Sequence, residues 1–399
     1  MRKLLFCGDA ACPSGFARST HKLCDYLDYR ANPDNPHPWE VHVMGLNYRG
    51  DPHPYKYDIW PAKLKDREDL FGQMLIPDLI QKIRPDVVAV QNDPWNFWRY
   101  LDVLRNVPVV GIVAIDGKNV QGRQLNGLHA AVFWTKFGAD QAMLGGFSGP
   151  YAVIPLGVDL DTYKPMDKDE ARKLFFQPND YDSGLKDAFI VSNVNRNQPR
   201  KRFDLSISYF AEWIKSRKIT DAYLHLHVAP TGDVGYDCHQ LAVYYGIANR
   251  LILSDSEVWK GVTEEVLARN YNIADLGIST SQGEGFGLTT AEMMACEIPN
   301  QVPDNAALGE WPEDTVVKIP CSEIAVTLNR VNIVGSLADR QPFIEGLDRF
   351  YRDSDMRKDY GKRGRALIER PNFRWSDIGA KFAEVLEAAT DVLGVKTIR

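Results

Sequence analysis

Short apolar runs alternate with helix-like stretches along the first part of the chain. Six runs have the length of strands: Leu4–Cys7, Val41–Leu46, Asp86–Gln91, Val109–Ile115, Ala131–Thr135 and Ala152–Leu156. Three stretches between them have apolar residues at helical spacing: Phe16–Asp28, Asp69–Ile83 and Lys136–Leu144. This alternation is typical of stacked βαβ units, so the pattern predicts an α/β fold with a parallel sheet.

The same pattern restarts after a turn-rich passage at Leu156–Pro165. Five further runs predict a second sheet: Phe189–Val194, Tyr223–Val228, Leu251–Ser254, Leu276–Ser281 and Val316–Ile319. Trp375–Leu393 predicts a long final helix. Because 399 residues exceed what one core usually supports, we expect two domains. We place a Rossmann-like domain at 1–157, a second at 158–375, and a terminal helix at 376–399 that crosses back to the first.

Composition and charge narrow the class of protein. The net charge of −6 gives no overall attraction to nucleic acid or anionic lipid. The longest apolar stretch, Val107–Ile115, is far shorter than the roughly 20 residues that span a bilayer. The apolar run at the N-terminus is also too short for a signal peptide, and the six cysteines form no CxxC pair. We therefore expect a cytoplasmic protein.

The most informative segment is Ser281-Gln-Gly-Glu-Gly-Phe-Gly-Leu-Thr-Thr-Ala-Glu292. Its glycines precede a good helix former, so the backbone can approach an anion at the start of a helix. A diphosphate suits such a site, and Glu284 and Glu292 would flank it. The alternatives are a tight turn followed by a solvated Glu292, or a dinucleotide-binding loop, whose third glycine position is absent.

Glu284 and Glu292 stand in the spacing E-x7-E, which resembles the signature of retaining GT-B glycosyltransferases of glycosyltransferase family 4. The resemblance covers nearly the whole chain. Four other segments are similar to that family: Ile154-Pro-Leu-Gly-Val-Asp159 with Tyr163-x-Pro165, Arg196-x4-Lys201, Tyr271–Leu276 and Met294–Pro299. The resemblance implies two Rossmann-like domains that face a cleft. It also implies a nucleotide-sugar as co-substrate, which we expect to be a UDP-sugar, and no required cofactor.

The resemblance also implies residue roles. Arg196 and Lys201 follow a predicted strand and would stabilise the departing diphosphate, although a solvated turn is the alternative. Glu284 would hold hydroxyls of the donor sugar. The expected donor-binding residues are Gly15, Arg196, Lys201, Gly285, Phe286, Gly287, Leu288, Thr289 and Glu292. For Gly15, the alternative is a helix-capping turn made with Ser14.

The sequence departs from the family pattern at one position that is expected to be catalytic. Many members place a His after the strand corresponding to Val109–Ile115, where this chain has Asp116-Gly117. We expect Asp116 to contact the transferred sugar or orient the acceptor; a turn with Gly117 is the alternative. The predicted catalytic residues are Asp116, Glu284, Arg196 and Lys201. The resemblance implies that the leaving diphosphate itself helps to deprotonate the acceptor.

No essential metal is expected. Asp-x-Asp pairs begin at residues 159, 167, 180 and 353, which is close to the number expected by chance. His225-x-His227 alternates within a predicted strand, which favours packing over metal binding.

Asp93, Trp95 and Trp98 follow another predicted strand and are the candidates for the acceptor side. Packing of these aromatic residues against a helix is the alternative. The acceptor is expected to be a glycan or small molecule, or a hydroxymethylated pyrimidine in DNA. The segments around Gly8 and Asn92 resemble phage and prokaryotic members of the family, and some phage members modify such bases. Phage origin would mean the host cytoplasm. Two other functions stay open: a catalytically silent nucleotide-sugar-binding protein, favoured by the missing His and by Glu297, and a nucleotide-sugar epimerase.

Overall fold

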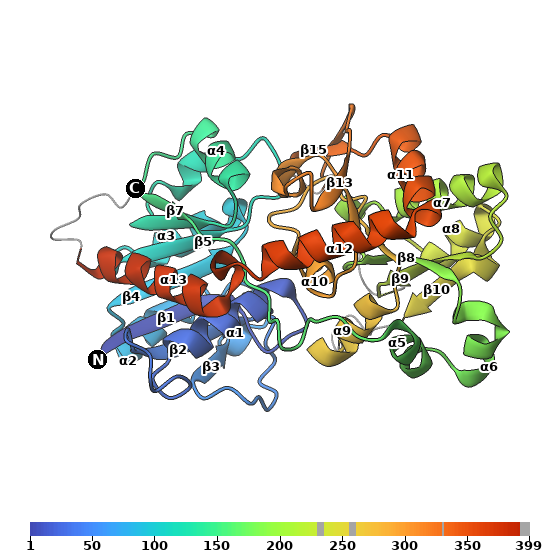
Figure 1. Ribbon diagram of the computed structural model, residues 1–399. Helices are drawn as coiled ribbons and strands as arrows, with labels where there is room; N and C mark the ends of the chain where they lie inside the picture. The colour runs from blue at the N-terminus through green and yellow to red at the C-terminus, as the bar shows by residue number, and fades with distance from the viewer. Residues whose placement is uncertain (230–234, 255–260, 329–330, 392–399) are drawn as a thin grey trace. The chain divides into compact units, whose positions relative to one another are not determined.

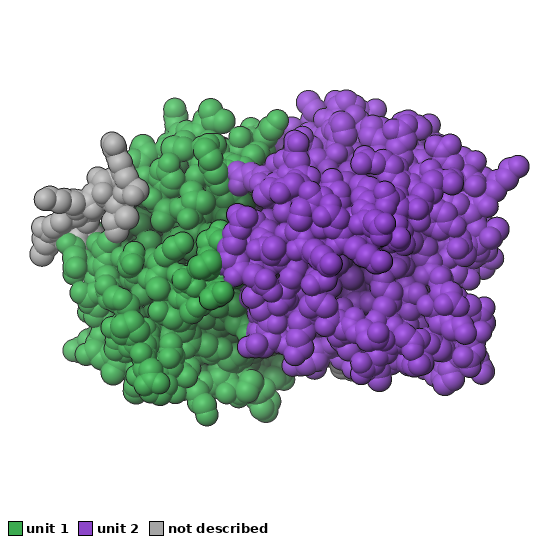
Figure 2. Space-filling model, viewed as in Figure 1, with its two compact units in different colours: residues 1–157, 371–399 green, residues 158–370 purple. Residues whose placement is uncertain are grey.

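The computed structural model describes residues 1–229, 235–254, 261–328 and 331–391 (Figure 1). Its contacts divide the chain into two compact units, which Figure 2 colours separately. Unit 1 comprises Met1–Gly157 and the chain from Pro371 onward, and unit 2 comprises Val158–Arg370.

Unit 1 is built on a seven-stranded parallel sheet in the order β3-β2-β1-β4-β5-β6-β7. Its strands are β1 (Arg2–Asp9), β2 (Trp39–Leu46), β3 (Asp58–Pro61), β4 (Val87–Asn92), β5 (Val109–Val113), β6 (Ala130–Phe133) and β7 (Tyr151–Val153). Its helices are α1 (Gly15–Leu27), α2 (Ile76–Ile83), α3 (Phe97–Val103), α4 (Lys136–Leu144) and α13 (Trp375–Thr390). From β1 the sheet extends to one side through β2 and β3 and to the other side from β4 to β7, as in doubly wound nucleotide-binding folds.

Helix α13 lies beside α1 in unit 1 although it comes from the end of the chain (Figure 1). Its Phe382 ring packs edge-on against Phe6 of β1, with the ring centroids 6.4 Å apart. Both rings are almost fully buried, so the final helix completes the core of unit 1.

Unit 2 contains a six-stranded parallel sheet in the order β10-β9-β8-β11-β12-β13 and a separate antiparallel hairpin. The sheet strands are β8 (Phe189–Val194), β9 (Ala222–His227), β10 (Leu251–Ser254), β11 (Leu276–Ile278), β12 (Asn300–Pro303) and β13 (Val316–Ile319), and the hairpin pairs β14 (Glu323–Val326) with β15 (Val334–Leu337). The helices are α5 (Lys168–Phe175), α6 (Pro178–Asp180), α7 (Phe203–Arg217), α8 (Cys238–Tyr244), α9 (Glu264–Asn272), α10 (Leu288–Ala295), α11 (Arg340–Arg352) and α12 (Ser354–Ile368). The core lies where α7 and α11 cover the sheet, around the buried Phe210, Trp213 and Phe343.

Every strand predicted from the apolar runs is present, and four others among the described residues were missed: β3, β12 and the two hairpin strands β14 and β15. A pattern of apolar residues does not predict strand β12, because this strand begins with the polar residues Asn300 and Gln301. Both are buried, and their side-chain amides donate to the carbonyls of Ile298 at 2.9 Å and Phe343 at 3.0 Å. Strand β3 was missed because it is a four-residue strand at the sheet edge, half-buried and ending in proline.

The predicted helix Asp69–Ile83 was wrong over its first half, because α2 begins only at Ile76. The Asp69 carboxylate accepts the backbone N–H groups of Phe71 at 3.3 Å and Met74 at 2.8 Å, which closes a turn. Gly72 then has a φ of +69°, which a helix does not contain. The final helix ends at Thr390, and residues 392–393 of its predicted span lie outside the described residues. Within the described ranges no helix is long and apolar enough to cross a membrane.

Candidate functional site

The glycine-rich segment connects β11 to α10 in unit 2. Gly287 precedes the first residue of α10 with a φ of +88°, a conformation that glycine adopts without strain. A Cβ at this position would lie 2.6 Å from Cδ2 of Leu308, so a side chain does not fit there. The backbone conformation that leads into α10 therefore requires glycine at position 287. This loop presents the first N–H groups of the helix.

Glu284 is held in this loop by two basic side chains. The Lys201 ammonium donates to Oε1 of Glu284, and Nη1 of Arg200 lies 3.3 Å from Oε2. The same Arg200 nitrogen donates to the Gly283 carbonyl at 2.9 Å. Burial on its own would raise the pKa of Glu284, but the charges of Lys201 and Arg200 outweigh it and hold that pKa below its ordinary value. Glu284 is thus an ionised carboxylate held by two basic side chains.

The basic residues come from the loop after β8, which the structure joins to the glycine loop by backbone contacts. Gln282 N donates to the Arg200 carbonyl at 2.8 Å, and the Thr280 hydroxyl donates to the Arg202 carbonyl at 2.9 Å. Strands β8 and β11 are parallel neighbours, so their carboxyl ends lie at the same edge of the sheet. Open α/β sheets bind ligands at this edge.

Glu292 is buried, so the alternative of a tight turn followed by a solvated Glu292 does not hold. It is 1% exposed, in the second turn of α10, and its Oε2 accepts the hydroxyl of Tyr271 from α9 at 2.5 Å. A carboxylate at this depth is stable only with hydrogen-bond donors around it. The site thus has two buried carboxylates, one at each end of the segment from 284 to 292.

The remaining contacts make the loop rigid. The Gln282 carbonyl accepts from Asn305 Nδ2 at 2.6 Å and from Ser336 N at 3.1 Å, which ties the loop to β15. Phe286 is buried, and its ring packs edge-on against Trp311 at 5.4 Å. Leu288 and Thr289 are the first two residues of α10, and Gly285 lies inside the loop. These contacts fix where the N–H groups of the loop point.

In the basic segment Arg196-x4-Lys201, the structure brings a further residue to Glu284. Arg196 is exposed in the loop after β8, and the arginine beside Glu284 is Arg200. Arg200 was not among the site residues predicted from the sequence. The signal was present, since Arg200 lies inside the Arg196-x4-Lys201 spacing and is the direct neighbour of Lys201.

The other predicted site residues lie in unit 1. Gly15 is the first residue of α1, directly after Ser14, whose hydroxyl accepts from Ala17 N at 3.0 Å; the capping turn considered above is therefore present. Asp116 is half-buried, three residues after β5 ends. Asp93 and Trp95 are half-buried between β4 and α3, while Trp98 is half-exposed on α3.

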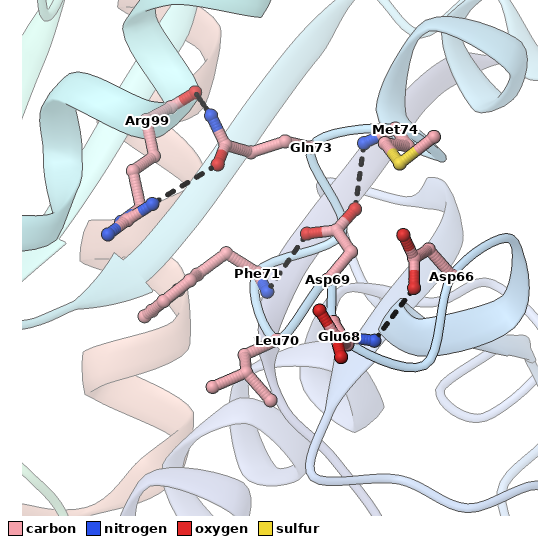
Figure 3. Close-up of a pocket in the computed structure, with 8 residues that line it drawn as sticks. All are labelled: Asp66, Glu68, Asp69, Leu70, Phe71, Gln73, Met74 and Arg99. Atoms are coloured by element: carbon pink, nitrogen blue, oxygen red, sulfur yellow. Dashed lines mark hydrogen bonds between the residues drawn. The ribbon is translucent and has the colours of Figure 1, made fainter.

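One surface pocket of about 390 Å³ lies beside Arg99 in unit 1 (Figure 3). Its lining comes from the loop before α2 and from α3: Asp66, Glu68, Asp69, Leu70, Phe71, Gln73, Met74 and Arg99. The Arg99 guanidinium lies 4.7 Å from the Phe71 ring centroid and 4.5 Å from that of Trp98. Trp98 thus stacks on the guanidinium of Arg99.

His225 and His227 belong to a buried hydrogen-bond network. His225 bonds to the hydroxyls of Ser192 at 2.8 Å and Ser254 at 2.9 Å, and His227 bonds to Ser254 at 2.7 Å. Burial lowers the pKa of His225 to about 3 and that of His227 to about 4, so both are neutral. Among the described residues, no group of three or more His, Cys, Asp or Glu side chains is arranged to hold a metal ion.

Two Rossmann-like parallel-sheet units define the fold as that of GT-B glycosyltransferase structures. The structure of sucrose-phosphate synthase from Thermosynechococcus elongatus superposes with a TM-score of 0.75 over 98% of this chain and 100% of that one, at 16% identity. Anabaena Alr3699/HepE in complex with UDP-glucose gives a TM-score of 0.69 over 97% and 100%, also at 16% identity. The GT-B fold expected from the sequence is confirmed.

Curated relatives match a shorter stretch. The D-inositol 3-phosphate glycosyltransferase of Geodermatophilus obscurus is 33% identical over 152 residues, which is 37% of this chain and 31% of that protein. The protein of the same name from Mycobacteroides abscessus is 32% identical over 152 residues, or 37% of this chain and 30% of that one. The chain thus spans about a third of the length of the curated relatives it matches. No protein-family model matches the chain.

Proposed function

We propose that the protein is a retaining glycosyltransferase that takes a sugar from a UDP-sugar and transfers it to an acceptor hydroxyl. The observation that carries the proposal is the cluster formed by the buried Glu284 and Lys201 with Arg200, beside the glycine loop before α10. The similarity to named glycosyltransferases and to the fold of structures solved with UDP-glucose supports it.

The cluster suits a diphosphate leaving group. Helix α10 presents the N–H groups of its first turn to the phosphates, and the Lys201 ammonium, which donates to Glu284, brings a positive charge to the same loop. When the bond between the sugar carbon and the diphosphate breaks, negative charge grows on the leaving oxygen. Lys201 and the basic loop after β8 stabilise that charge, and we assign Arg196 to the same role.

The two carboxylates have different tasks in this proposal. Glu284, ionised and fixed by two cations, accepts hydrogen bonds from hydroxyls of the transferred sugar. Glu292 accepts from the ribose hydroxyls, with Tyr271 holding its orientation. The acceptor oxygen forms its bond to the sugar carbon on the face that the diphosphate leaves, and the acceptor proton passes to a phosphate oxygen. No covalent enzyme intermediate is required.

We assign the acceptor to residues of unit 1 that follow its strands: Asp93, Trp95, Trp98 and Asp116. The acceptors to test are chosen by chemistry. A polyol phosphate is suggested by the names of the curated relatives, and a glycan and a DNA oligonucleotide with hydroxymethylated pyrimidine complete the panel.

A panel of nucleotide sugars tests the donor. We expect one of them to raise the Tm and to be hydrolysed slowly or transferred. Glu292→Ala should mainly raise KM for the donor, whereas Lys201→Ala should mainly lower kcat; Lys362→Ala, at an exposed position on α12, is the control.

The other functions predict different results in the same assay. A rise in Tm without any turnover would indicate a nucleotide-sugar-binding protein. Conversion of the donor sugar without transfer or hydrolysis would indicate an epimerase. If no donor raises the Tm and none is turned over, the proposed function fails.

A further inference from the structure

A chain of hydrogen bonds runs from the loop between β1 and α1 to three side chains in unit 1. The Ala11 N–H donates to Nε2 of His21 at 2.7 Å, and Nδ1 of His21 lies 2.8 Å from the Tyr57 hydroxyl. Tyr57 in turn is hydrogen-bonded to Asp25. We propose that His21, Tyr57 and Asp25 form a positioning device that fixes this loop at Ala11.

The direction of each hydrogen bond follows from the chemistry of the groups. A backbone N–H can only donate, so Nε2 of His21 must carry the lone pair and Nδ1 the proton. Nδ1 therefore donates to the Tyr57 oxygen, and the Tyr57 proton is directed to the Asp25 carboxylate. The Ala11 N–H thus sets the histidine tautomer, and Tyr57 with Asp25 gives the Nδ1–H an ordered acceptor.

The loop needs such a fixed point. Ala11 has a φ of +47°, a left-handed conformation that costs a non-glycine residue about 1 kcal/mol. On both sides of Ala11 the loop is also tied, since the Ser14 hydroxyl donates to Asp9 at 2.7 Å and Asn47 donates to Asp9 at 3.0 Å. The hydrogen bond to His21 holds the strained residue between these ties.

His21 is itself held in a single orientation. It is 5% exposed, and its ring stacks on Tyr55 with the centroids 3.5 Å apart and the planes 6° from parallel. His21 and Asp25 are four residues apart on α1, so they share one face of the helix, and Tyr57 reaches them from the segment before β3. Burial, with a smaller effect of His53, lowers the pKa of His21 to about 3, so the ring keeps its acceptor nitrogen at all ordinary pH values.

This inference has one part that rests on the proposed function. If Gly15 approaches the donor phosphate, the device sets the loop that leads to it, and the three side chains act as positioning residues without touching the ligand. The loop geometry itself does not depend on any activity.

Amide hydrogen exchange and imidazole ¹⁵N shifts, measured by NMR on the full chain without ligand, test the geometry. His21→Phe keeps the stacked ring but removes the acceptor, and we expect exchange of the Ala11 amide to become at least tenfold faster. His21→Gln supplies a new acceptor and should restore most of the protection. Tyr57→Phe, which changes volume least, leaves the Nδ1–H without its acceptor, so exchange of the Ala11 amide should become faster in this variant too. His129→Phe is the control, since His129 Nδ1 accepts the Val109 N–H at 3.1 Å elsewhere in the same sheet.

The function is tested with UDP-glucose as the probe. His21→Phe should raise KM at least fivefold with kcat changed less than twofold, and His21→Gln should restore KM. If the wild type turns over no donor, the proposed function fails while the exchange result still decides the positioning device. An Ala11 amide that stays equally protected in His21→Phe or in Tyr57→Phe, or an imidazole whose Nδ1 carries no proton in the wild type, would overturn the inference.

Discussion

The ammonium of Lys201 and the carboxylate of Glu284 form a buried ion pair, although 83 positions separate them in the sequence. Lys201 is 7% exposed and Glu284 is 8% exposed. A buried pair contributes little net stability, because desolvation offsets attraction, but removal of one partner leaves a buried charge. The pair therefore makes the candidate site sensitive to single substitutions.

Lys201→Met should lower the free energy of unfolding by about 3 kcal/mol, as should Glu284→Gln. The double variant should lose clearly less than the sum, since neither charge is then left behind. Urea unfolding of the four proteins measures this coupling. Lys65→Met, which breaks the exposed pair with Asp78, is the control and should change stability little. Strict additivity of the two substitutions would show that the residues do not interact.

The lowered pKa of Glu284 predicts how the free energy of unfolding of the protein changes in acid. Because the folded-state pKa lies below the ordinary value of 4.5, the folded protein binds this proton less tightly than the unfolded chain. The stabilisation is therefore complete above about pH 4.5 and is lost as the pH falls through the folded-state pKa. Between pH 6 and pH 3, the wild type should lose more stability than Glu284→Gln. Parallel loss in both proteins would contradict the assignment.

The sheets could be predicted from the sequence because most strands are runs of apolar residues that parallel sheets bury on both faces. The exceptions have physical causes. Strand β12 carries Asn300 and Gln301, whose burial depends on hydrogen-bond partners that no local pattern reveals. The glycine loop was recognised because its spacing is local. In contrast, the choice of Arg200 over Arg196 beside Glu284 depends on how two loops meet.

The network around His21 had no signal in the sequence. Its members come from α1, from the segment before β3 and from the loop after β1. Each residue by itself is ordinary, and only the packing of those segments brings the three groups together.

Gly287→Ala should impair the candidate donor site. The residue has a φ of +88°, and a Cβ would lie 2.6 Å from Leu308, so both strain and a clash oppose the change. We expect a loss of at least 2 kcal/mol of stability, on the order of strain at a left-handed residue plus overpacking. The donor-induced rise in Tm should also shrink. Gly184→Ala is the matched control, since Gly184 has a φ of +121° but nothing within 4 Å of its Cβ position. Equal losses would show that backbone strain alone matters at Gly287.

Asp25→Asn should stabilise the protein at high pH and leave it nearly unchanged at low pH. Burial raises the pKa of Asp25 to about 6, against the hydrogen bond from Tyr57 and the charge of Lys22, while Asp28 raises it further. The folded protein thus holds this proton more tightly than the unfolded chain, so its stability falls as the pH rises from about 4 to about 6. Above that range the wild type carries an unfavourable charge worth on the order of 2 kcal/mol.

Asparagine is neutral at every pH and still accepts from Tyr57, so the variant avoids this cost. Urea unfolding at pH 8 should show a gain of about 2 kcal/mol, and the gain should be close to zero at pH 4. Asp182→Asn, at an exposed position, should show no such difference between the two pH values. Since the carboxylate also directs the Tyr57 proton, stabilisation at pH 8 with unchanged exchange at Ala11 would show that a neutral acceptor at position 25 is sufficient. A gain of the same size at both pH values would mean that the charge of Asp25 is not the cause.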